Sequence, residues 1–378
     1  MSGDSPLPYG RQDIDQSDID AVTAVLRGEW LTTGPAVDAF EKSLSLVACD
    51  VSCVSVTSGT AALHVGYAGL GVGPGDEVVT SPFTFMATAS SAAVLGATVH
   101  FADVCDDTLN LDPEAVAALQ TRRLSVVAAV DYAGHPADLD GLRAVADKSG
   151  ARLLEDAAHS MGGRYRGRPI GSIADVTTFS FFPTKHMTTA EGGAVTTPHA
   201  DIAARARRFA RIGRSQDPTA TQVEGGWWYE MTEFGLNYRL PDVLCALGIS
   251  QLQRLPRFVA RRAELVARYN ELLASQPGLR LPTQRDDVEP AWHLYSIRIL
   301  DGRRREVFDR LRSAGILVQV NYIPAYWHPV FVDLGYRRGI CPVAEKAYAE
   351  QLSLPLFPAM RDADQDRVVH ALCDILGP

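Results

Sequence analysis

Three side chains that could act in one reaction each follow an apolar, strand-like run: Ser58, Asp156 and Lys185. Lys185 comes after residues 177–182, a β-branched and aromatic run typical of a buried strand, and before a Glu-Gly-Gly turn at 191–193. An amine in a mostly apolar setting loses hydration, so its pKa falls from about 10.4 and it can form an imine with a carbonyl group. Taken alone, however, a lysine in a turn is more often a surface residue.

A turn of small residues, Thr57-Ser58-Gly59-Thr60, lies between a predicted strand at 51–56 and a predicted helix that begins at Ala61. The first N–H groups of a helix have no partner within the helix, and a phosphate can accept their hydrogen bonds. The turn matches neither G-x-G-x-x-G nor G-x-x-x-x-G-K-[ST], so it implies neither a dinucleotide nor a nucleoside triphosphate. A plain helix cap is the alternative interpretation.

The elements around these residues alternate between strands and helices. The hydrophobic pattern predicts strands at 77–80, 98–101, 124–130, 152–154 and 194–197, and helices at 13–27, 37–47, 85–95, from 112 and at 139–148. Such alternation predicts an α/β fold with a mostly parallel sheet covered by helices, in which ligands bind beyond the carboxyl ends of the strands. Ser58, Asp156 and Lys185 are therefore expected on one side of the sheet.

The C-terminal part of the chain predicts a smaller α+β domain. The pattern gives helices from 241, at 258–273, 305–313, 343–352 and 364–376, and strands at 292–300 and 318–323. We therefore predict a large domain at 1–255 and a small domain at 256–378. Within the large domain, residues 222–238 form an irregular aromatic stretch, which is expected to be buried against a second subunit or a ligand. The Arg-rich helix at 202–212 is more typical of a solvated face than of an anion site.

Composition narrows the class of protein. The 378 residues carry a net charge of −9, which argues against nucleic acid or an anionic membrane as a partner. The six cysteines include no C-x-x-C pair, so neither a metal site nor a disulfide framework is predicted. The sequence shows no signal-peptide pattern and no apolar run long enough to span a bilayer, and we expect a cytoplasmic protein.

One cofactor would use the small-residue turn at 57–60, Asp156 and Lys185 together. Pyridoxal phosphate requires a turn that binds its phosphate and an aromatic side chain that stacks on its pyridine ring. It also requires a lysine that forms an imine and a carboxylate beside the pyridine nitrogen. An ionised Asp156 would keep that nitrogen protonated, because a nearby opposite charge favours the charged form. A nicotinamide oxidoreductase is less consistent with the missing G-x-G-x-x-G motif. A regulator that binds the cofactor without turnover would not need Lys185.

Nearly the whole chain also resembles the DegT/DnrJ/EryC1/StrS sugar aminotransferases, which are fold-type-I pyridoxal phosphate enzymes. The resemblance implies a large domain with a mostly parallel seven-stranded sheet, flanked by helices, and a smaller C-terminal domain. The matching segments are 30–35 (Trp-Leu-Thr-Thr-Gly-Pro), 58–64 (Ser-Gly-Thr-Ala-Ala-Leu-His), 81–85, 155–159 (Glu-Asp-Ala-Ala-His), 180–185 (Ser-Phe-Phe-Pro-Thr-Lys), 191–193, 235–239 (Gly-Leu-Asn-Tyr-Arg) and 292–295 (Trp-His-Leu-Tyr).

The resemblance implies roles for individual residues. Lys185 would carry the cofactor as an imine and then act as acid and base, and Asp156 would pair with the pyridinium nitrogen. Phe85 would stack on the ring, and His159, where many relatives have Gln, would contact the ring's phenolate oxygen. The residues implied to bind the phosphate are Gly59, Thr60, Ala61, Ser180 and, across the interface of a homodimer, Asn237.

Substrate contacts are implied for Trp30, Thr32, Tyr229, Tyr322 and His328. Segments 8–10, 228–231 and 321–324 are most similar to the branch that aminates UDP-4-keto-6-deoxy-N-acetylhexosamines, as in pseudaminic acid biosynthesis. The segment Tyr326-Trp327-His328-Pro329 departs from the His-Leu-Gln-Pro of many relatives, and it borders the sugar pocket in the family.

The reaction that these resemblances imply is a ping-pong transfer of an amino group from an amino acid, expected to be L-glutamate, to C4 of a nucleotide-linked keto-deoxysugar. Relatives that remove a sugar hydroxyl carry His in place of the lysine, whereas this chain keeps Lys185. A cyclitol or antibiotic-sugar aminotransferase of the same family is the alternative within this class. A non-catalytic, cofactor-binding regulatory protein is the alternative of another class.

Overall fold

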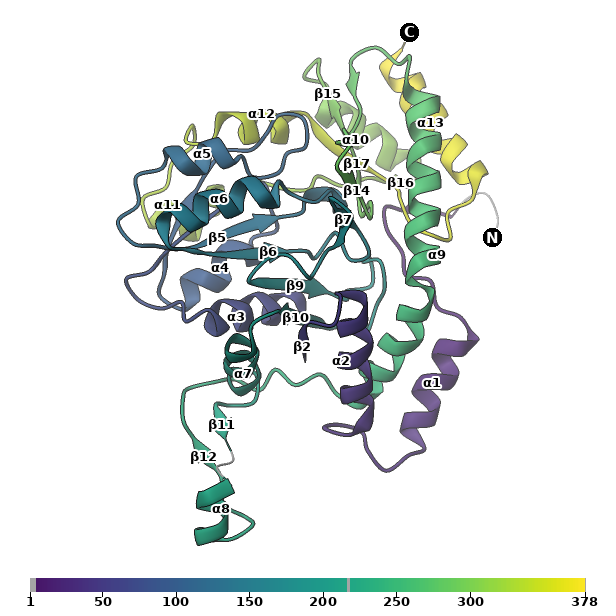
Figure 1. The fold of residues 1–378 in the computed structure, drawn as a ribbon. Coiled ribbons are helices and arrows are strands. Elements are labelled where there is room, and N and C mark those ends of the chain that lie inside the picture. Colours follow the sequence, from purple (N-terminus) through teal and green to yellow (C-terminus); the bar gives the residue numbers. More distant parts are fainter. Residues whose placement is uncertain (1–4, 216–217, 378) are drawn as a thin grey trace.

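The computed structural model describes residues 5–215 and 218–377, and its centre is a seven-stranded sheet with the strand order β2-β10-β9-β6-β5-β3-β4 (Figure 1). β10 runs antiparallel to both neighbours, and the other pairs are parallel. The prediction of a mostly parallel seven-stranded sheet is therefore confirmed. The strands are β2 (Ser52–Val56), β3 (Glu77–Thr80), β4 (Thr98–Phe101), β5 (Leu124–Val130), β6 (Arg152–Asp156), β9 (Val176–Ser180) and β10 (Gly193–Thr197).

Both faces of this sheet are buried. Successive side chains of a strand point to opposite faces, so Val126 packs in one hydrophobic cluster and Val127 in the other. The first face is covered by α3 (Gly59–Gly69), α4 (Ala87–Val94), α7 (Ala200–Phe209), α11 (Pro329–Asp333) and α12 (Pro342–Glu350). The second is covered by α2 (Pro35–Val47), α5 (Pro113–Ala118), α6 (Leu139–Ser149) and the start of α9 (Asp242–Leu273).

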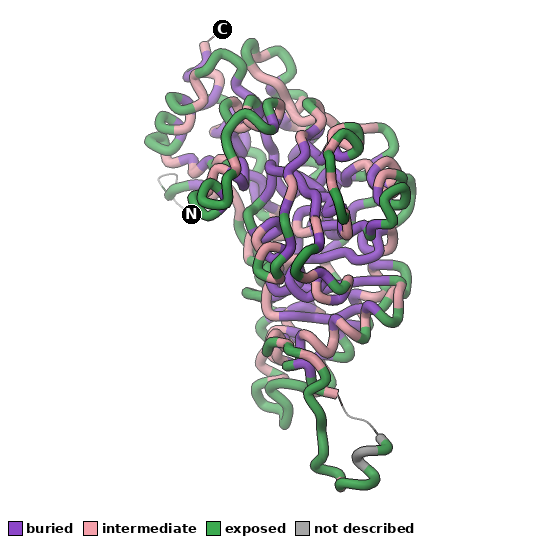
Figure 2. Tube along the Cα trace, turned by 90° about the vertical axis from the view of Figure 1, so that its left-hand side faces the viewer, coloured by how far each residue is buried: buried purple, intermediate pink, exposed green. Residues whose placement is uncertain are grey.

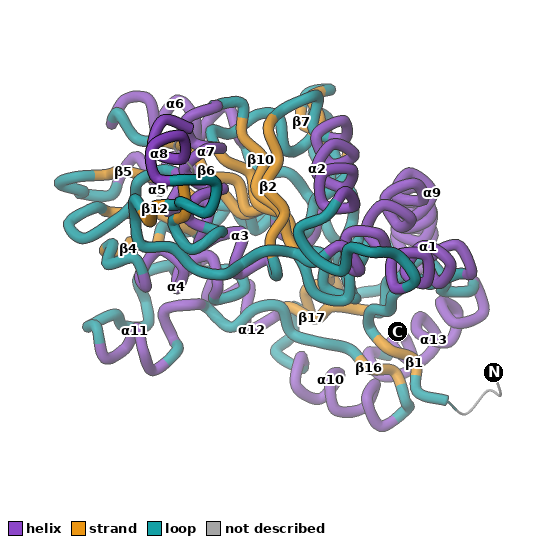
Figure 3. The backbone as a smooth tube through the Cα atoms, turned by 90° about the horizontal axis from the view of Figure 1, so that it is seen from below, coloured by secondary structure: helices purple, strands orange, loops and turns teal. Residues whose placement is uncertain are grey.

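Helix α9 links the sheet to the C-terminal elements. The sequence pattern predicts two helices here, but the structure has one continuous helix of 32 residues that contains Pro256. The prediction of a break was wrong because Phe258 and Leu265 continue the buried stripe of Cys245 and Leu252 across the proline. α1 (Gln16–Leu26) and α2 lie against its first half (Figure 3). The predicted domain boundary at 255/256 falls within this helix.

The C-terminal elements surround a third hydrophobic cluster. Its strands are β13 (Leu279–Arg280), β15 (Tyr295–Ile299) and β17 (Gln351–Leu354), and its helices are α10 (Arg304–Ser313) and α13 (Asp362–Leu376). The N-terminal β1 (Leu7–Pro8) pairs with β16 (Ile316–Leu317). Shorter elements are β7 (Arg164–Tyr165), β8 (Arg168–Pro169), β14 (Val288–Glu289) and the 3-10 turns at Tyr132–Gly134 and Ala325–Trp327.

Residues 318–323 do not form the predicted strand. Gln319 forms an isolated bridge with Ser353 of β17, but side chains bind both backbone groups of Asn321. The Asn321 N–H donates to the Gln351 side chain at 2.9 Å, and the Tyr132 hydroxyl donates to the Asn321 carbonyl at 2.7 Å. The alternating apolar pattern here reflects packing beside the sheet rather than membership of it. The segment instead brings Asn321 and Tyr322 to the wall of a cavity.

An arm projects from the body of the molecule (Figures 1 and 2). It spans residues 214–215 and 218–234 and contains α8 (Pro218–Glu224) and the strand pair β11 (Arg214–Ser215) and β12 (Glu230–Met231), so the stretch predicted to be irregular is partly ordered. Its large side chains are exposed in the single chain, with Trp227 at 78% and Phe234 at 89% of full accessibility. Any burial of this arm must therefore come from another molecule. No helix in the described ranges is long and apolar enough to cross a membrane.

Candidate active site

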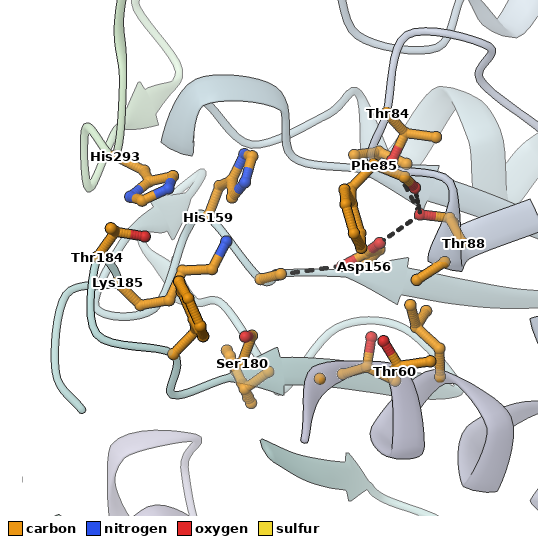
Figure 4. Close-up of a pocket in the computed structure, with 18 of the residues that line it drawn as sticks. Thr60, Thr84, Phe85, Thr88, Asp156, His159, Ser180, Thr184, Lys185 and His293 are labelled. Carbon is orange, nitrogen blue, oxygen red and sulfur yellow. Dashed lines mark hydrogen bonds between the residues drawn. The ribbon is translucent and has the colours of Figure 1, made fainter. Parts of the chain in front are cut away.

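A cavity of about 510 Å³ opens at the carboxyl ends of β2, β6 and β9. It brings together Ser58, Asp156 and Lys185, the residues that the sequence places after strands. Figure 4 shows Asp156 and Lys185 in this cavity. The cavity lies where a parallel sheet presents its loops, and its volume is typical of a small-molecule site.

The floor of the cavity is the N-terminus of α3. Ser58 caps this helix by accepting the Ala61 N–H at 3.1 Å. Gly59 and Thr60 line the cavity at the helix start, whereas Ala61 does not, and its N–H is taken by the cap. Ser180 lies so close that a Cβ on Gly59 would sit 2.7 Å from the Ser180 Cβ. A glycine at position 59 thus allows the serine hydroxyl and the helix amides to share one concave surface.

Asp156 ends β6 and is 6% exposed. Its Oδ2 accepts the Thr88 hydroxyl at 2.6 Å, and its Oδ1 accepts the Ala158 N–H at 3.2 Å. Thr84 supports Thr88, since their hydroxyl oxygens lie 2.8 Å apart. Burial raises the pKa of the Asp156 carboxyl, whereas the Thr88 and Ala158 hydrogen bonds and the charge of Lys185 lower it. A cationic group placed in the cavity would favour the ionised carboxylate further.

Lys185 follows β9 in a turn in which its N–H donates to the Phe182 carbonyl at 2.9 Å. Burial lowers the pKa of the amine to about 8, the charge of Arg262 adds to the shift, and Asp156 opposes it. A lysine with an ordinary pKa is almost wholly protonated near neutral pH. The Lys185 amine can therefore both hold and release a proton in the physiological range, as a nucleophile or a general base must.

His159, Tyr322 and Phe85 form one wall of the cavity. The His159 Nε2 and the Tyr322 hydroxyl lie 3.1 Å apart, and the Phe85 and Tyr322 rings meet edge-on at 6.0 Å between centroids. Burial holds the pKa of His159 well below its ordinary value, and the charge of Lys185 adds to this shift. The imidazole is therefore neutral. Its Nδ1 is buried and has no hydrogen-bond partner within the described residues.

The other residues predicted to bind ligands lie outside this cavity: Trp30, Thr32, Tyr229, Asn237 and His328. Asn237 is exposed and forms an isolated backbone bridge with Arg211. Tyr229 lies on the arm, where the Arg214 guanidinium stacks 4.1 Å from its ring centroid.

Trp30 and Thr32 are exposed in the loop before α2, and His328 precedes α11. A single chain does not bring these five residues to the cavity that contains Lys185.

Sequence reasoning missed several residues of the cavity. Thr84 and Thr88 gave a weak signal, two hydroxyls one helical turn apart after a predicted strand. His293 belongs to a motif but received no role, although its ring lies 4.4 Å from that of His159. Tyr9 lines the same cavity from the far N-terminus.

The residues present fit pyridoxal phosphate. The α3 amides and Ser180 suit a phosphate, and the buried Asp156 forms no salt bridge within the described chain, so it suits a protonated ring nitrogen. The Nδ1 of His159 has no hydrogen-bond partner within the described residues, so the protein does not satisfy every polar atom around the cavity. Across the described ranges, no three His, Cys, Asp or Glu side chains are grouped so that they could hold a metal ion.

Comparison with known proteins adds to this geometry. A family model described as the DegT/DnrJ/EryC1/StrS aminotransferase family matches residues 12–373. The spore coat polysaccharide biosynthesis protein SpsC of Bacillus subtilis is 39% identical, over 98% of this chain and 97% of its own length.

Two solved structures are similar over nearly their full length. The putative sugar aminotransferase Spr1654 from Streptococcus pneumoniae, in its PMP form, has a TM-score of 0.93 at 29% identity, covering 98% of each chain. PseC of Helicobacter pylori, an aminotransferase involved in the biosynthesis of pseudoaminic acid, has a TM-score of 0.92 at 27% identity, covering 98% of this chain and 99% of its own.

The Thr88 hydroxyl yields a testable prediction. Replacing Thr88 with Val removes the hydrogen bond to Asp156 and raises the pKa of that carboxyl further. Because a hydrogen bond to a charged group contributes about 1.5–3 kcal/mol, we expect the affinity for pyridoxal phosphate to fall at least about tenfold. Since ionised Asp156 is lost as pH falls through its pKa, the acid-side loss of binding should move to higher pH. A spectroscopic binding titration across pH measures both effects.

Thr88→Ser is the matched control, because it keeps the hydroxyl and removes one methyl group. It should bind the cofactor nearly as well as the wild type. Equal affinity and an equal acid limb for the Val variant and the wild type would contradict the role given to this hydrogen bond.

Proposed function

The chain belongs to the DegT/DnrJ/EryC1/StrS aminotransferase family, and on that premise we propose that it transfers the amino group of L-glutamate to C4 of a nucleotide-linked keto-deoxysugar. It is a pyridoxal-phosphate-dependent sugar aminotransferase. The observation that carries the proposal is the pairing of a weakly basic amine, Lys185, with a buried carboxylate, Asp156, in one cavity above a helix N-terminus.

The chain's residues would hold the cofactor from three directions. The N–H groups of Gly59 and Thr60, with the Ser180 hydroxyl, would bind the phosphate. Asp156 would face the ring nitrogen, and Phe85 would cover the ring. When bound, pyridoxal phosphate supplies an aldehyde that can receive an amino group and a ring that stabilises negative charge on the neighbouring carbon.

Lys185 is proposed to move the proton. Its Nζ would take a proton from the carbon that bears the donor's nitrogen and later return one at the carbon that receives the amino group. An amine with a pKa of about 8 suits both directions near neutral pH, since neither its protonated nor its neutral form is rare. The ionised Asp156 would stabilise the positive charge of the ring nitrogen throughout the reaction, and Thr88 would hold the carboxylate in place.

The sugar is proposed from three lines of support. PseC, a structural relative over nearly the whole chain, acts in the biosynthesis of pseudoaminic acid, and the segments around Tyr9, Tyr229 and Tyr322 resemble the branch that aminates UDP-linked 4-keto sugars. Neutral polar side chains line the cavity at Tyr9, Gln319 and Asn321, and such groups suit sugar hydroxyls.

The site is also proposed to be completed by a second subunit of a homodimer. The predicted ligand residues that this chain does not bring to its own cavity are exposed or partly exposed: Trp30, Thr32, Tyr229, Asn237 and His328. The arm that carries Tyr229 exposes Trp227 and Phe234 to an extent unusual for side chains of their size. Asn237 would reach the partner's phosphate site.

A substrate panel tests the reaction. Purified protein loaded with pyridoxal phosphate is given L-glutamate and one of several acceptors: UDP-, dTDP- and GDP-linked 4-keto-6-deoxysugars, 3-keto isomers, or keto-cyclitols. We expect the fastest turnover with a UDP-linked 4-keto sugar, read as the mass change that accompanies replacement of the keto oxygen by an amino group. Turnover of a cyclitol without turnover of any nucleotide sugar would overturn the substrate assignment.

A mixing experiment tests the shared site. Lys185→Ala and Asn237→Asp should each be inactive, the second because its carboxylate repels the phosphate. In a mixed dimer of the two, one of the two sites has both native residues, so the isolated mixed dimer should have about half of wild-type activity. Co-expression with two affinity tags isolates the mixed dimer.

The control for mixing is Lys185→Ala with Asp156→Ala. These residues belong to the same chain's cavity, so no native site can form in their mixed dimer, and it should stay inactive. Failure of the Lys185→Ala and Asn237→Asp pair to regain activity, while the mixed dimer forms, would contradict the role of Asn237.

A further inference from the structure

Arg262 is a fully buried arginine at the centre of α9, with 0% exposure. Burial lowers the pKa of its guanidinium to about 10, and no carboxylate forms a salt bridge with it among the described residues. Its Nε has no hydrogen-bond partner in the part of the chain that the structure describes. A buried cation without a counter-charge is costly, and arginine in a helix is ordinarily solvated or paired.

The guanidinium binds backbone carbonyls instead. One terminal nitrogen donates to the carbonyls of Leu356, His293 and Trp292 at 3.0, 3.2 and 3.4 Å, and the other donates to the Thr184 carbonyl at 3.4 Å. Thr184 immediately precedes Lys185. One side chain therefore joins the turn that carries the proposed catalytic lysine to the segment that carries His293.

The segment around Trp292 needs such support. Trp292 has a φ of 42°, a left-handed conformation that an aromatic residue rarely adopts. The N–H groups of His293 and Leu294 both donate to the Ala133 carbonyl, which holds the segment from one side. Arg262 holds its carbonyls from the other side. Between them, these contacts keep His293 in the wall of the cavity.

The groups that face this cation are basic. Lys185 and His186 lie on the turn after β9, and His293 lies on the segment after Trp292. The charge of Arg262 contributes to lowering the pKa of each. His159 lies beyond His293, and Asp156 is the carboxylate that opposes the shift on Lys185. The fixed positive charge of Arg262 therefore disfavours protonation of these neighbouring basic side chains.

We propose that Arg262 is a positioning residue for Lys185: its guanidinium fixes the turns that carry Lys185 and His293. Its charge, a smaller contributor than burial, also favours the uncharged amine. The proposal rests on the catalytic role proposed for Lys185. Arginine suits this task better than lysine, because its planar fork can reach carbonyls of separate segments and stays charged when buried. The neutral form of the amine is the one that can accept a proton or attack a carbonyl group.

Titration of Lys185 in the full-length chain, freed of cofactor, tests the charge directly. The chain has four lysines, Lys42, Lys148, Lys185 and Lys346, and the other three are exposed, so they serve as internal standards. Trace labelling with acetic anhydride across pH, read peptide by peptide in a mass spectrometer, gives the midpoint for each amine. The variants are Arg262→Gln, Arg262→Lys and the control Arg261→Gln, whose residue is on the same helix but binds Glu264 and Asp362.

We expect the Lys185 midpoint to rise in Arg262→Gln, because a cation that disfavours protonation of the amine is lost. It should stay near the wild-type value in Arg262→Lys and Arg261→Gln. An unchanged midpoint in a folded Arg262→Gln chain would overturn the charge effect. The readout needs no sugar and no turnover, so a wrong substrate assignment leaves it unaffected.

Arg262→Lys tests whether the guanidinium fixes the turns that carry Lys185 and His293. It also provides a test if the Arg262→Gln chain does not fold. A single ammonium group cannot reach the carbonyls of Thr184, His293 and Leu356 together. We therefore expect the cofactor to dissociate at least about tenfold faster from the loaded Arg262→Lys variant than from Arg261→Gln, followed by absorbance during dilution. Equal dissociation rates would overturn the proposal that the Arg262 guanidinium fixes these turns.

Discussion

The site depends on placing an amine and a carboxylate in one desolvated cavity. Burial acts on the two in opposite directions, since it lowers the pKa of Lys185 and raises that of Asp156. Each charge also favours the other, so neither group's protonation is set alone. The hydrogen bond from Thr88 shifts this balance toward an ionised Asp156, and the charge of Arg262 shifts it toward a neutral Lys185. That combination suits a reaction that needs a base beside a cationic ring.

The fold meets this requirement by drawing the site from distant parts of the chain. The sheet supplies Asp156 and Ser180 at the ends of neighbouring strands. Helices cover the sheet on both faces, since Val126 packs in one hydrophobic cluster and Val127 in the other. Helix α9 runs from the sheet to the C-terminal elements, and Arg262 near its middle contacts the Lys185 turn. The geometry around the lysine is thus tied to packing on both sides of the predicted domain boundary.

Residue types and strand order predicted much of this arrangement. Ser58, Asp156 and Lys185 each follow a recognisable apolar run, so their convergence could be expected from the topology of a parallel sheet. Thr88 could not be identified in this way, because its partner lies 68 residues away and a helical threonine has no distinctive pattern. Arg262 resembles any polar residue on an amphipathic helix. Residues 318–323 have the pattern of a strand, because the sequence does not reveal that Gln351 and Tyr132 bind the backbone of Asn321.

The central claim is that Lys185 is the residue that carries the cofactor. Borohydride reduction of the loaded, full-length protein fixes the cofactor to whichever lysine holds it, and peptide mass mapping then locates it. The account predicts the added pyridoxyl mass on the Lys185 peptide, with Lys42, Lys148 and Lys346 unmodified. The added mass on one of those three exposed lysines, or on none of the four, would contradict it.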